Sequence, residues 1–357
     1  MTTTDTAGPA TSETDRSRWR TLAASGLAGA CIPTVYGGAG FGAVGTALEL
    51  ERAGYDHLDT GLVFGVAAHL LACAVPIRDL ASEATRRELL PGLCSGELIA
   101  SNAITEPGAG SDVGSLRTTA VAIDGGYLLR GVKSFASNGP IADIFVTYAT
   151  TAPSDGYLGL SGFVVDGSSP GIEVTPLDKM GLHGCPAGRV EFRDVYVPAG
   201  RILGEPGSGG PVFQHSMAWE RTCLFAIYLG CMRRVIERCV EHGRNRRQWG
   251  RAIGDFQAVS HRIADMHRRM LAARHLLLAA AQSLDDGDHD AVLISSSKVT
   301  TSEAAVSVAS DAIQIFGGAG YLTGTGIERE LRDAVPGQIF SGTNDVHRGL
   351  IAGGLGL

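Results

Sequence analysis

Thr105-Glu-Pro-Gly-Ala-Gly-Ser-Asp112 is the most specific stretch of this 357-residue sequence. Its proline and glycines predict a tight turn, and such a turn leaves backbone N–H groups and hydroxyls free to bind a ligand. A phosphate group or the edge of a heteroaromatic ring would suit these donors. By itself the stretch is also typical of a structural turn between two domains, so its meaning depends on the sequence around it.

The sequence around this turn changes from helical to β-rich patterns and back to helical patterns. The β-rich part consists of short runs separated by Gly, Pro and Asp, which predicts a sandwich or barrel. We therefore expect an α+β protein with four segments: a disordered tail (residues 1–16), an N-terminal helical domain (17–99), a middle β-sandwich or barrel domain (100–210) and a C-terminal four-helix bundle (211–357). Helix breaks in the N-terminal domain are expected at Pro33, Gly37–Gly38, Pro76 and Pro91. The longest helices are expected at Val212–His242, Phe256–Leu284 and Ala291–Phe316.

The composition is typical of a soluble globular protein, with 44% hydrophobic and 19% charged residues. The 30 Lys and Arg against 37 Asp and Glu give a net charge of −7, which disfavours a nucleic-acid surface. The seven cysteines are scattered and form no CxxC pair, so we expect neither a disulfide framework nor a zinc site, and a cytoplasmic location fits. We also expect no signal peptide and no apolar run long enough to span a membrane.

Two glycine motifs are better explained as turns. The motif Gly40-Phe-Gly-Ala-Val-Gly45 matches GxGxxG, but a dinucleotide fingerprint needs a strand before it and a second strand after its helix. The motif Gly167-Ser-Ser-Pro-Gly171 matches GxSxG, but it lies between two expected strands, whereas a nucleophile elbow joins a strand to a helix. The ten histidines show no metal-binding spacing, so no metal is expected. The basic cluster Arg244–Arg251 fits either a solvated helix end or an anion site.

Further motifs follow the Thr105 turn in a fixed order. They are Lys133-Ser-Phe-Ala-Ser-Asn-Gly139, Lys179-Met-Gly-Leu-His-Gly184, Phe192-Arg-Asp-Val-Tyr-Val-Pro198, Arg246 to Gln257, Gln314-Ile-Phe-Gly-Gly-Ala-Gly-Tyr321, Glu328-Arg-Glu-Leu-Arg-Asp333 and Ser341-Gly-Thr-Asn-Asp345. Each motif is weak evidence, but the set in this order resembles the acyl-CoA dehydrogenase family from about Trp19 to the C-terminus. The resemblance implies that the protein binds FAD.

The resemblance also implies which residues contact the cofactor. Thr105 and Ser137 stand where the family hydrogen-bonds the flavin ring, and Phe135 stands where an aromatic side chain flanks it. Gly110 lets the backbone approach, and Ser111 matches a residue that touches phosphate groups of the cofactor or substrate. The remaining matches are Arg246, Gln248, Trp249, Gln314, Gly317 and Gly318, which a neighbouring subunit contributes, and Thr343 and Asp345 of the last motif. A cofactor shared between chains implies a homodimer or homotetramer.

The candidate base departs from the commonest pattern of the family. That pattern places a Glu directly before the Gly-Thr of the last motif, where this chain has Ser341. A serine hydroxyl of ordinary acidity cannot remove the α-proton of a thioester. The isovaleryl- and long-chain-specific branch instead carries its base in a Glu-Arg pair on a helix, and Glu220-Arg221 stands at the matching point. Arg221 is in addition a candidate substrate contact.

The helical pattern around Glu220 favours this assignment. Glu220 shares a helical stripe with apolar residues: Leu224, Ile227, Cys231 and Val235. Burial would raise the pKa of its carboxyl, which suits a general base that works near neutral pH. The alternative is that Glu220 caps a helix N-terminus or pairs with Arg221 or another cation.

The resemblance implies α,β-dehydrogenation of an acyl thioester to the trans-2-enoyl thioester. Glu220 would remove the α-proton, and flavin N5 would accept the β-hydride. The backbone N–H of Ser341 could still bind the developing enolate oxygen, and the small Ser341 side chain would leave space for a branched or substituted acyl group. Both CoA and a carrier protein fit as thioester carriers, with an electron-transfer flavoprotein as the expected acceptor. The alternatives are a flavin oxidase or monooxygenase on the same scaffold and a non-catalytic flavin-binding protein.

Overall fold

The structure is a computed structural model that describes residues 13–357. Most of the expected tail, residues 1–12, lies outside the described residues. Helix α1 (Glu13–Ala23) begins inside the last four residues of that expected tail. Arg16 explains the early start, because its guanidinium bonds the Asp143 carboxylate at 2.7 Å and the Ile141 carbonyl at 3.0 Å.

The N-terminal domain is helical, as expected. Its main elements are α2 (Ala43–Asp56), α3 (Thr60–Ala68), the π-helix η3 (His69–Ala74), α4 (Val75–Leu80) and α5 (Glu83–Ser95). Asp59 caps α3 by accepting from the Leu62 N–H at 3.1 Å, and Ser82 caps α5 in the same way. The Gly40–Gly45 motif is a turn that leads into α2, as expected.

The expected helix breaks at Pro76 and Pro91 are wrong. Pro91 lies inside α5 on its exposed side, where water can solvate the carbonyl that loses its helical donor. Pro76 lies within a continuous helical run, Thr60–Leu80, and follows the π-helix η3. The carbonyl four residues before Pro76, that of Ala72, accepts a hydrogen bond from the Ser216 hydroxyl at 3.5 Å instead.

The run Thr60–Leu80 also corrects the expectation about membrane spans. The run has 21 residues, and its most apolar 18-residue window has a mean hydropathy of 1.9, so it is long and apolar enough to cross a bilayer. However, 89% of that window is buried inside the fold. A helix that is apolar on all sides belongs in the core of a protein of this size as readily as in a membrane. In this structure it is a core helix.

The middle domain is one folded eight-stranded sheet. Its strands are β1 (Ala100–Ala103), β2 (Thr119–Ile123), β3 (Gly126–Ser137), β4 (Ile144–Thr150), β5 (Leu160–Asp166), β6 (Ile172–Leu177), β7 (Ala187–Pro198) and β8 (Ile202–Leu203). The order is β6-β7-β3-β2-β4-β5-β8, with β1 parallel to β4. The Gly167–Gly171 motif is the turn between β5 and β6, as expected.

The sheet folds over itself and encloses a small core of its own. Phe145 of β4 meets Phe192 of β7 with ring centroids 6.2 Å apart, and Tyr127 of β3 meets Phe163 of β5 at 5.1 Å. The other face of β4, including Tyr148, packs against the helices. Strand β4 is therefore buried on both faces, and it connects the sheet to the helical part of the site.

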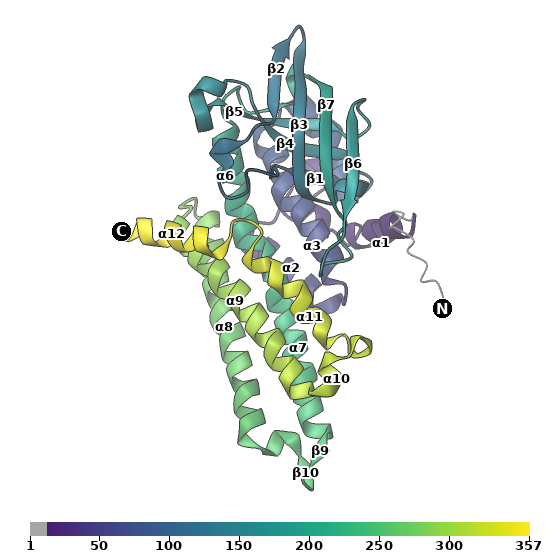
Figure 1. Ribbon diagram of the computed structural model, residues 1–357, viewed down its shortest axis with the longest axis vertical. Coiled ribbons are helices and arrows are strands. Elements are labelled where there is room, and N and C mark those ends of the chain that lie inside the picture. The colour runs from purple at the N-terminus through teal and green to yellow at the C-terminus, as the bar shows by residue number, and fades with distance from the viewer. Residues whose placement is uncertain (1–12) are drawn as a thin grey trace.

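The C-terminal domain is built from long helices that extend away from the sheet (Figure 1). They are α6 (Gly209–Trp219), the π-helix η8 (Glu220–Leu224), α7 (Ala226–Asn245), α8 (Gln257–Asp285), α9 (Ala291–Phe316), α10 (Gly318–Tyr321), α11 (Ile327–Ala334) and α12 (Asn344–Gly354). The hairpin β9 (Arg247–Gln248) and β10 (Arg251–Ala252) lies at the far end. The single helix expected at Val212–His242 is thus interrupted by a π-helix, a feature that is frequent at functional sites.

Two glycines bring α2 unusually close to α7. A Cβ atom on Gly54 would lie 2.2 Å from the Ile227 carbonyl oxygen, and one on Gly230 would lie 2.0 Å from the Glu51 carbonyl oxygen. Neither position therefore has room for a side chain. This close crossing fixes the N-terminal domain against the helix that continues from Glu220.

Candidate active site

A buried ion pair holds the Thr105–Asp112 turn. The Glu106 carboxylate accepts hydrogen bonds from Lys133 Nζ at 2.8 Å and from the N–H groups of Arg117 and Thr118 at 2.7 and 2.9 Å. Lys133 is completely buried, and burial lowers the pKa of its ammonium to about 8. Burial would raise the pKa of Glu106, but Lys133 and the other donors outweigh it and lower that pKa. The base of the turn is therefore rigid, while Gly110 and Ser111 at its tip are exposed.

Phe135 lies beside this turn in a strained backbone conformation. The pairing of β3 with β7 shifts register between Lys133 and Ala136, and Phe135 in this bulge has φ 57°. The Ser134 N–H donates to the Thr105 carbonyl at 2.7 Å, which joins the bulge to the turn. Phe135 is 71% exposed. Strain of this kind persists where the surroundings enforce it, often at binding sites, and an exposed aromatic ring suits a flat partner such as a flavin.

Ser137 ends β3 two residues after Phe135, and Asn138 fixes its position. Asn138 also has positive φ, 63°, and its side-chain amide donates to the Gly65 carbonyl at 2.8 Å. This bond ties the end of β3 to α3. Thr105, Phe135 and Ser137 thus share one edge of the middle domain, and their backbones are fixed before any ligand binds. That arrangement, with open space around Gly110, fits the ring and phosphates of FAD.

Glu220 lies at the junction of α6 and η8, and only 8% of it is exposed. The Ser341 hydroxyl donates a short hydrogen bond to Glu220 Oε1. Burial raises the pKa of the Glu220 carboxyl, although the Ser341 hydroxyl and the Arg221 charge partly oppose this rise. The residue sits eleven positions after the start of α6, so it does not cap that helix. A buried carboxyl with a raised pKa, and with one hydrogen-bond donor among the described residues, has the properties of a general base.

Among the described residues, Arg221 forms no ion pair with Glu220. Its Nε donates instead to the Ser341 carbonyl at 3.0 Å. Burial lowers the pKa of the Arg221 guanidinium. Arg221 therefore contacts the same loop as Glu220, but through the backbone of that loop.

The Ser341–Gly342 loop has a left-handed backbone, and side chains donate hydrogen bonds to its carbonyl groups. Ser341 has φ 57° and Gly342 has φ 92°. The Ser341 carbonyl accepts from His347 Nε2 at 3.0 Å, and the Gly342 carbonyl accepts from Lys298 Nζ at 2.8 Å. Burial lowers the pKa of His347 to about 4, so its imidazole is neutral, and burial lowers the pKa of Lys298 to about 7. No sequence motif pointed to Lys298 or His347, which meet this loop only in the folded chain.

Two residues of the last motif already have structural partners. Thr343 caps α12, because its hydroxyl accepts from the Val346 N–H at 3.3 Å. Asp345 is exposed and pairs with Arg348 at 2.6 Å. Their expected contacts with the cofactor stay predictions.

The remaining predicted cofactor residues lie at the opposite end of the long helices (Figure 1). Trp249, at the tip of the β9–β10 hairpin, has φ 53° and is 91% exposed. Gly317 and Gly318 follow the end of α9 with open space around them. Stacking of Phe316 on His242, with centroids 4.2 Å apart, joins this end of α9 to α7. The other residues of this group, all exposed, are Arg246, Gln248 and Gln314.

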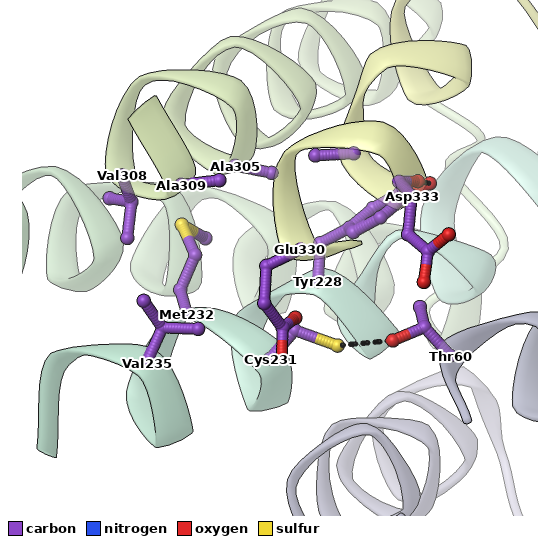
Figure 2. Close-up of a pocket in the computed structure, with 11 residues that line it drawn as sticks. Thr60, Tyr228, Cys231, Met232, Val235, Ala305, Val308, Ala309, Glu330 and Asp333 are labelled. Atoms are coloured by element: carbon purple, nitrogen blue, oxygen red, sulfur yellow. Dashed lines mark hydrogen bonds between the residues drawn. The ribbon is translucent and has the colours of Figure 1, made fainter. Parts of the chain in front are cut away.

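A separate small cavity lies inside the bundle between α7, α9 and α11 (Figure 2). Val235 and Val308 give it apolar walls, while Glu330 and Asp333 enter from α11. Arg234 pairs with Glu330 at 3.1 Å, so the arginine is buried on this side of α7. The space open to a water centre is ≈ 10 Å³, about enough for one water molecule. This cavity is part of the core and does not include Glu220.

Comparisons with known proteins agree with the geometry. Sequence models of the acyl-CoA dehydrogenase N-terminal, middle and C-terminal domains match residues 4–97, 101–195 and 207–356. An L-prolyl-[peptidyl-carrier protein] dehydrogenase of Pseudomonas fluorescens is 52% identical over 94% of this chain and 89% of its own. A similarly named enzyme of a Serratia species is 42% identical over 95% and 88%.

Solved structures give the same result. The structure described as "PigA with FAD and proline" has a TM-score of 0.94 and 41% identity, covering 96% of this chain and 90% of its own. The fold, the family and the cofactor expected from the sequence are confirmed. The chain belongs to the acyl-CoA dehydrogenase family, and it is an FAD-dependent oxidoreductase that dehydrogenates acyl thioesters.

Proposed function

We propose that this protein oxidises an L-prolyl group carried as a thioester on a peptidyl carrier protein, with Glu220 as the base. The observation that supports the base is the buried Glu220 carboxyl and its bond from Ser341. The substrate is inferred from the two relatives named for prolyl carrier proteins, which cover about nine tenths of the chain. A small serine at the loop position leaves room for a ring at the α-carbon, which fits a prolyl group.

In this mechanism the chain moves a proton and stabilises charge. The Glu220 carboxylate accepts the α-proton of the acyl group. Its raised pKa makes it a stronger base than an ordinary carboxylate, which favours this proton transfer. The backbone N–H of Ser341 has no acceptor among the described residues, and it is available to donate to the thioester oxygen as negative charge develops there. Arg221 and His347 donate to the carbonyl of the same residue, and so they hold the backbone of the loop that carries this N–H. Bound FAD supplies the hydride acceptor at its N5 atom.

The direct test is anaerobic bleaching of the bound flavin. Prolyl-carrier protein is expected to bleach it rapidly, and butyryl-CoA and free L-proline slowly or not at all. The measurement is the absorbance of oxidised flavin after rapid mixing. Equal rates with butyryl-CoA and prolyl-carrier protein would remove the proposed substrate and leave the family assignment intact.

Ser341→Ala is expected to move the rising limb of the pH–rate profile to higher pH. The Ser341 hydroxyl donates to the carboxylate form of Glu220 and lowers its pKa, so its loss raises that pKa further. Activity depends on the deprotonated base, so at pH values below the new pKa the variant is slower. The measurement is the rate of flavin reduction between pH 5 and 9, and Ser302→Ala, on α9 beneath the loop, is the control. An unchanged limb would mean that the profile does not report on Glu220.

The proposal extends to the assembly and the acceptor. The exposed Trp249 hairpin and the open Gly317–Gly318 turn lie too far along the helices to complete the FAD site of their own chain, so we infer a homodimer or homotetramer that shares cofactor sites. A flavin-loaded monomer in sedimentation experiments would contradict this.

An electron-transfer flavoprotein is the inferred electron acceptor. The free thiols of all seven cysteines are buried, and they favour a cytoplasmic location.

Oxygen is the second candidate acceptor. A solved structure described as a "Prolyl Acyl Carrier Protein Oxidase AnaB" is 38% identical, with a TM-score of 0.94. Air added to the bleached enzyme distinguishes the two acceptors. Reoxidation within a turnover time, with formation of hydrogen peroxide, would identify an oxidase, and slow reoxidation would identify a dehydrogenase.

A further inference from the structure

Tyr148 has a buried hydroxyl that no other described residue hydrogen-bonds. The residue is 1% exposed, and its Oη atom meets no donor or acceptor among the described residues. Lys133 Nζ donates to the Tyr148 carbonyl at 2.7 Å, which fixes the backbone of the residue from behind. Buried polar atoms are nearly always paired, so an isolated hydroxyl held this rigidly calls for a partner.

The hydroxyl faces the helices that carry the base. The side chain of Tyr148 lies on the helix-facing side of β4, and its ring meets Phe213 of α6 at 5.8 Å and 80°. Phe213 and Glu220 are seven residues apart, which places them on one face of the helix, roughly 10 Å apart along its axis. Burial raises the pKa of Tyr148, and the nearby Cys73, Glu220 and Tyr157 raise it further. The elements that carry Tyr148, Cys73 and Phe213, namely β4, η3 and α6, pack against one another, since η3 contacts both of the others.

A second unpaired oxygen lies on the same side of the sheet. Asn102 of β1 is opposite Val146 in the parallel pair β1–β4, two residues before Tyr148, so both side chains lie on the helix-facing side. Asn102 Oδ1 is also buried, and it too meets no partner in the described part of the chain. Two oxygens without partners among the described residues, on neighbouring strands, give the helix-facing side of the sheet a polarity that a plain hydrocarbon chain cannot satisfy.

We propose that the Tyr148 hydroxyl is a specificity determinant that hydrogen-bonds the ring nitrogen of the substrate acyl group. The inference rests on the proposed function, and it names the residue that distinguishes a cyclic aminoacyl thioester from a hydrocarbon one. The hydroxyl can accept from a protonated secondary amine or donate to a neutral one. A site that leaves a buried polar group unpaired with the wrong substrate discriminates against that substrate.

The test compares two acyl groups of the same shape on the same carrier protein. Prolyl and cyclopentanecarbonyl thioesters differ only by NH in place of CH₂. In Tyr148→Phe the preference for prolyl, as the ratio of kcat/KM values, is expected to fall roughly 10- to 100-fold, with the cyclopentanecarbonyl rate unchanged or higher. Tyr127→Phe is the matched control, because that ring packs on Phe163 inside the sheet, away from the helices.

The other outcomes overturn the inference. An unchanged ratio means that water or protein satisfies the hydroxyl, and an equal loss with both substrates means that Tyr148 acts only on packing. If the wild-type holoenzyme does not oxidise a prolyl thioester, the proposed function fails. The contact between Tyr148 and the amine is then tested independently of activity, by calorimetric binding of free L-proline and of cyclopentanecarboxylate. Weaker binding of proline alone in Tyr148→Phe would support the amine contact, and equal effects on both ligands would remove it.

Discussion

Glu220→Gln is expected to slow flavin reduction by about 10⁴-fold, the upper range for loss of a positioned general base, while FAD stays bound. Glutamine has the same shape and can still accept the Ser341 hydroxyl bond, so the packing at the junction of α6 and η8 survives. It cannot accept the α-proton. The measurement is single-turnover bleaching of the flavin under anaerobic conditions, which isolates chemistry from product release.

Glu330→Gln is the matched control for that variant. Glu330 is also a buried carboxyl of the helical domain, 6% exposed, with a pKa raised by burial. Glu330 lines the core cavity (Figure 2) and pairs with Arg234, so the variant is expected to lower the melting temperature without changing the rate of flavin reduction per bound FAD. If Glu220→Gln kept more than about a tenth of the wild-type rate, another group would have to be the base.

Much of the fold follows from local sequence patterns. Strands such as β4 and β5 are β-branched and aromatic runs between turns, and α8 and α9 carry long helical periodicity, so their places could be predicted. Strand β1 could not, because Ala100–Ala103 is a run of small and polar residues that becomes a strand only by pairing with β4. The helix breaks predicted at Pro76 and Pro91 were wrong for a related reason. Tertiary contacts or solvent can satisfy the carbonyls that a proline leaves without a donor in a helix.

Residues of the candidate site could be predicted only where they belong to a recognisable sequence motif. Glu220 and Ser341 could be named as a pair because each stands at a recognisable position, and the structure places them in hydrogen-bond contact across 121 residues. Lys298 and His347 hold the Ser341 loop through carbonyl oxygens, a contact that leaves no signature in the sequence. Tyr148 is likewise one aromatic residue in a strand, and its unpaired hydroxyl appears only when burial and partners are known.

Lys133→Met is expected to destabilise the protein by about 3–5 kcal/mol, the usual cost of leaving one buried charge unpaired, and to reduce its FAD content. The variant removes the ammonium that faces Glu106 while the carboxylate stays 6% exposed beside the Arg117 and Thr118 N–H groups. The same carboxylate holds the base of the Thr105–Asp112 turn, so its displacement loosens the segment expected to bind the cofactor. The measurements are the melting temperature and the ratio of bound flavin to protein.

Two further variants separate the loss of charge pairing from a general effect on the sheet. Arg130 lies on the same strand as Lys133, and Arg130→Met breaks its ion pair with Asp194 of β7. Both side chains are more than half exposed, so a much smaller loss of stability is expected than for Lys133→Met. The double variant Glu106→Gln/Lys133→Met leaves no unpaired charge. The amide oxygen introduced at position 106 can still accept from one of the two turn N–H groups. The double variant should therefore recover part of the stability and flavin content that Lys133→Met loses. If the double variant were less stable than Lys133→Met, the ion pair would not be what holds the turn, and the packing of the Lys133 chain inside the sheet would have to explain the effect.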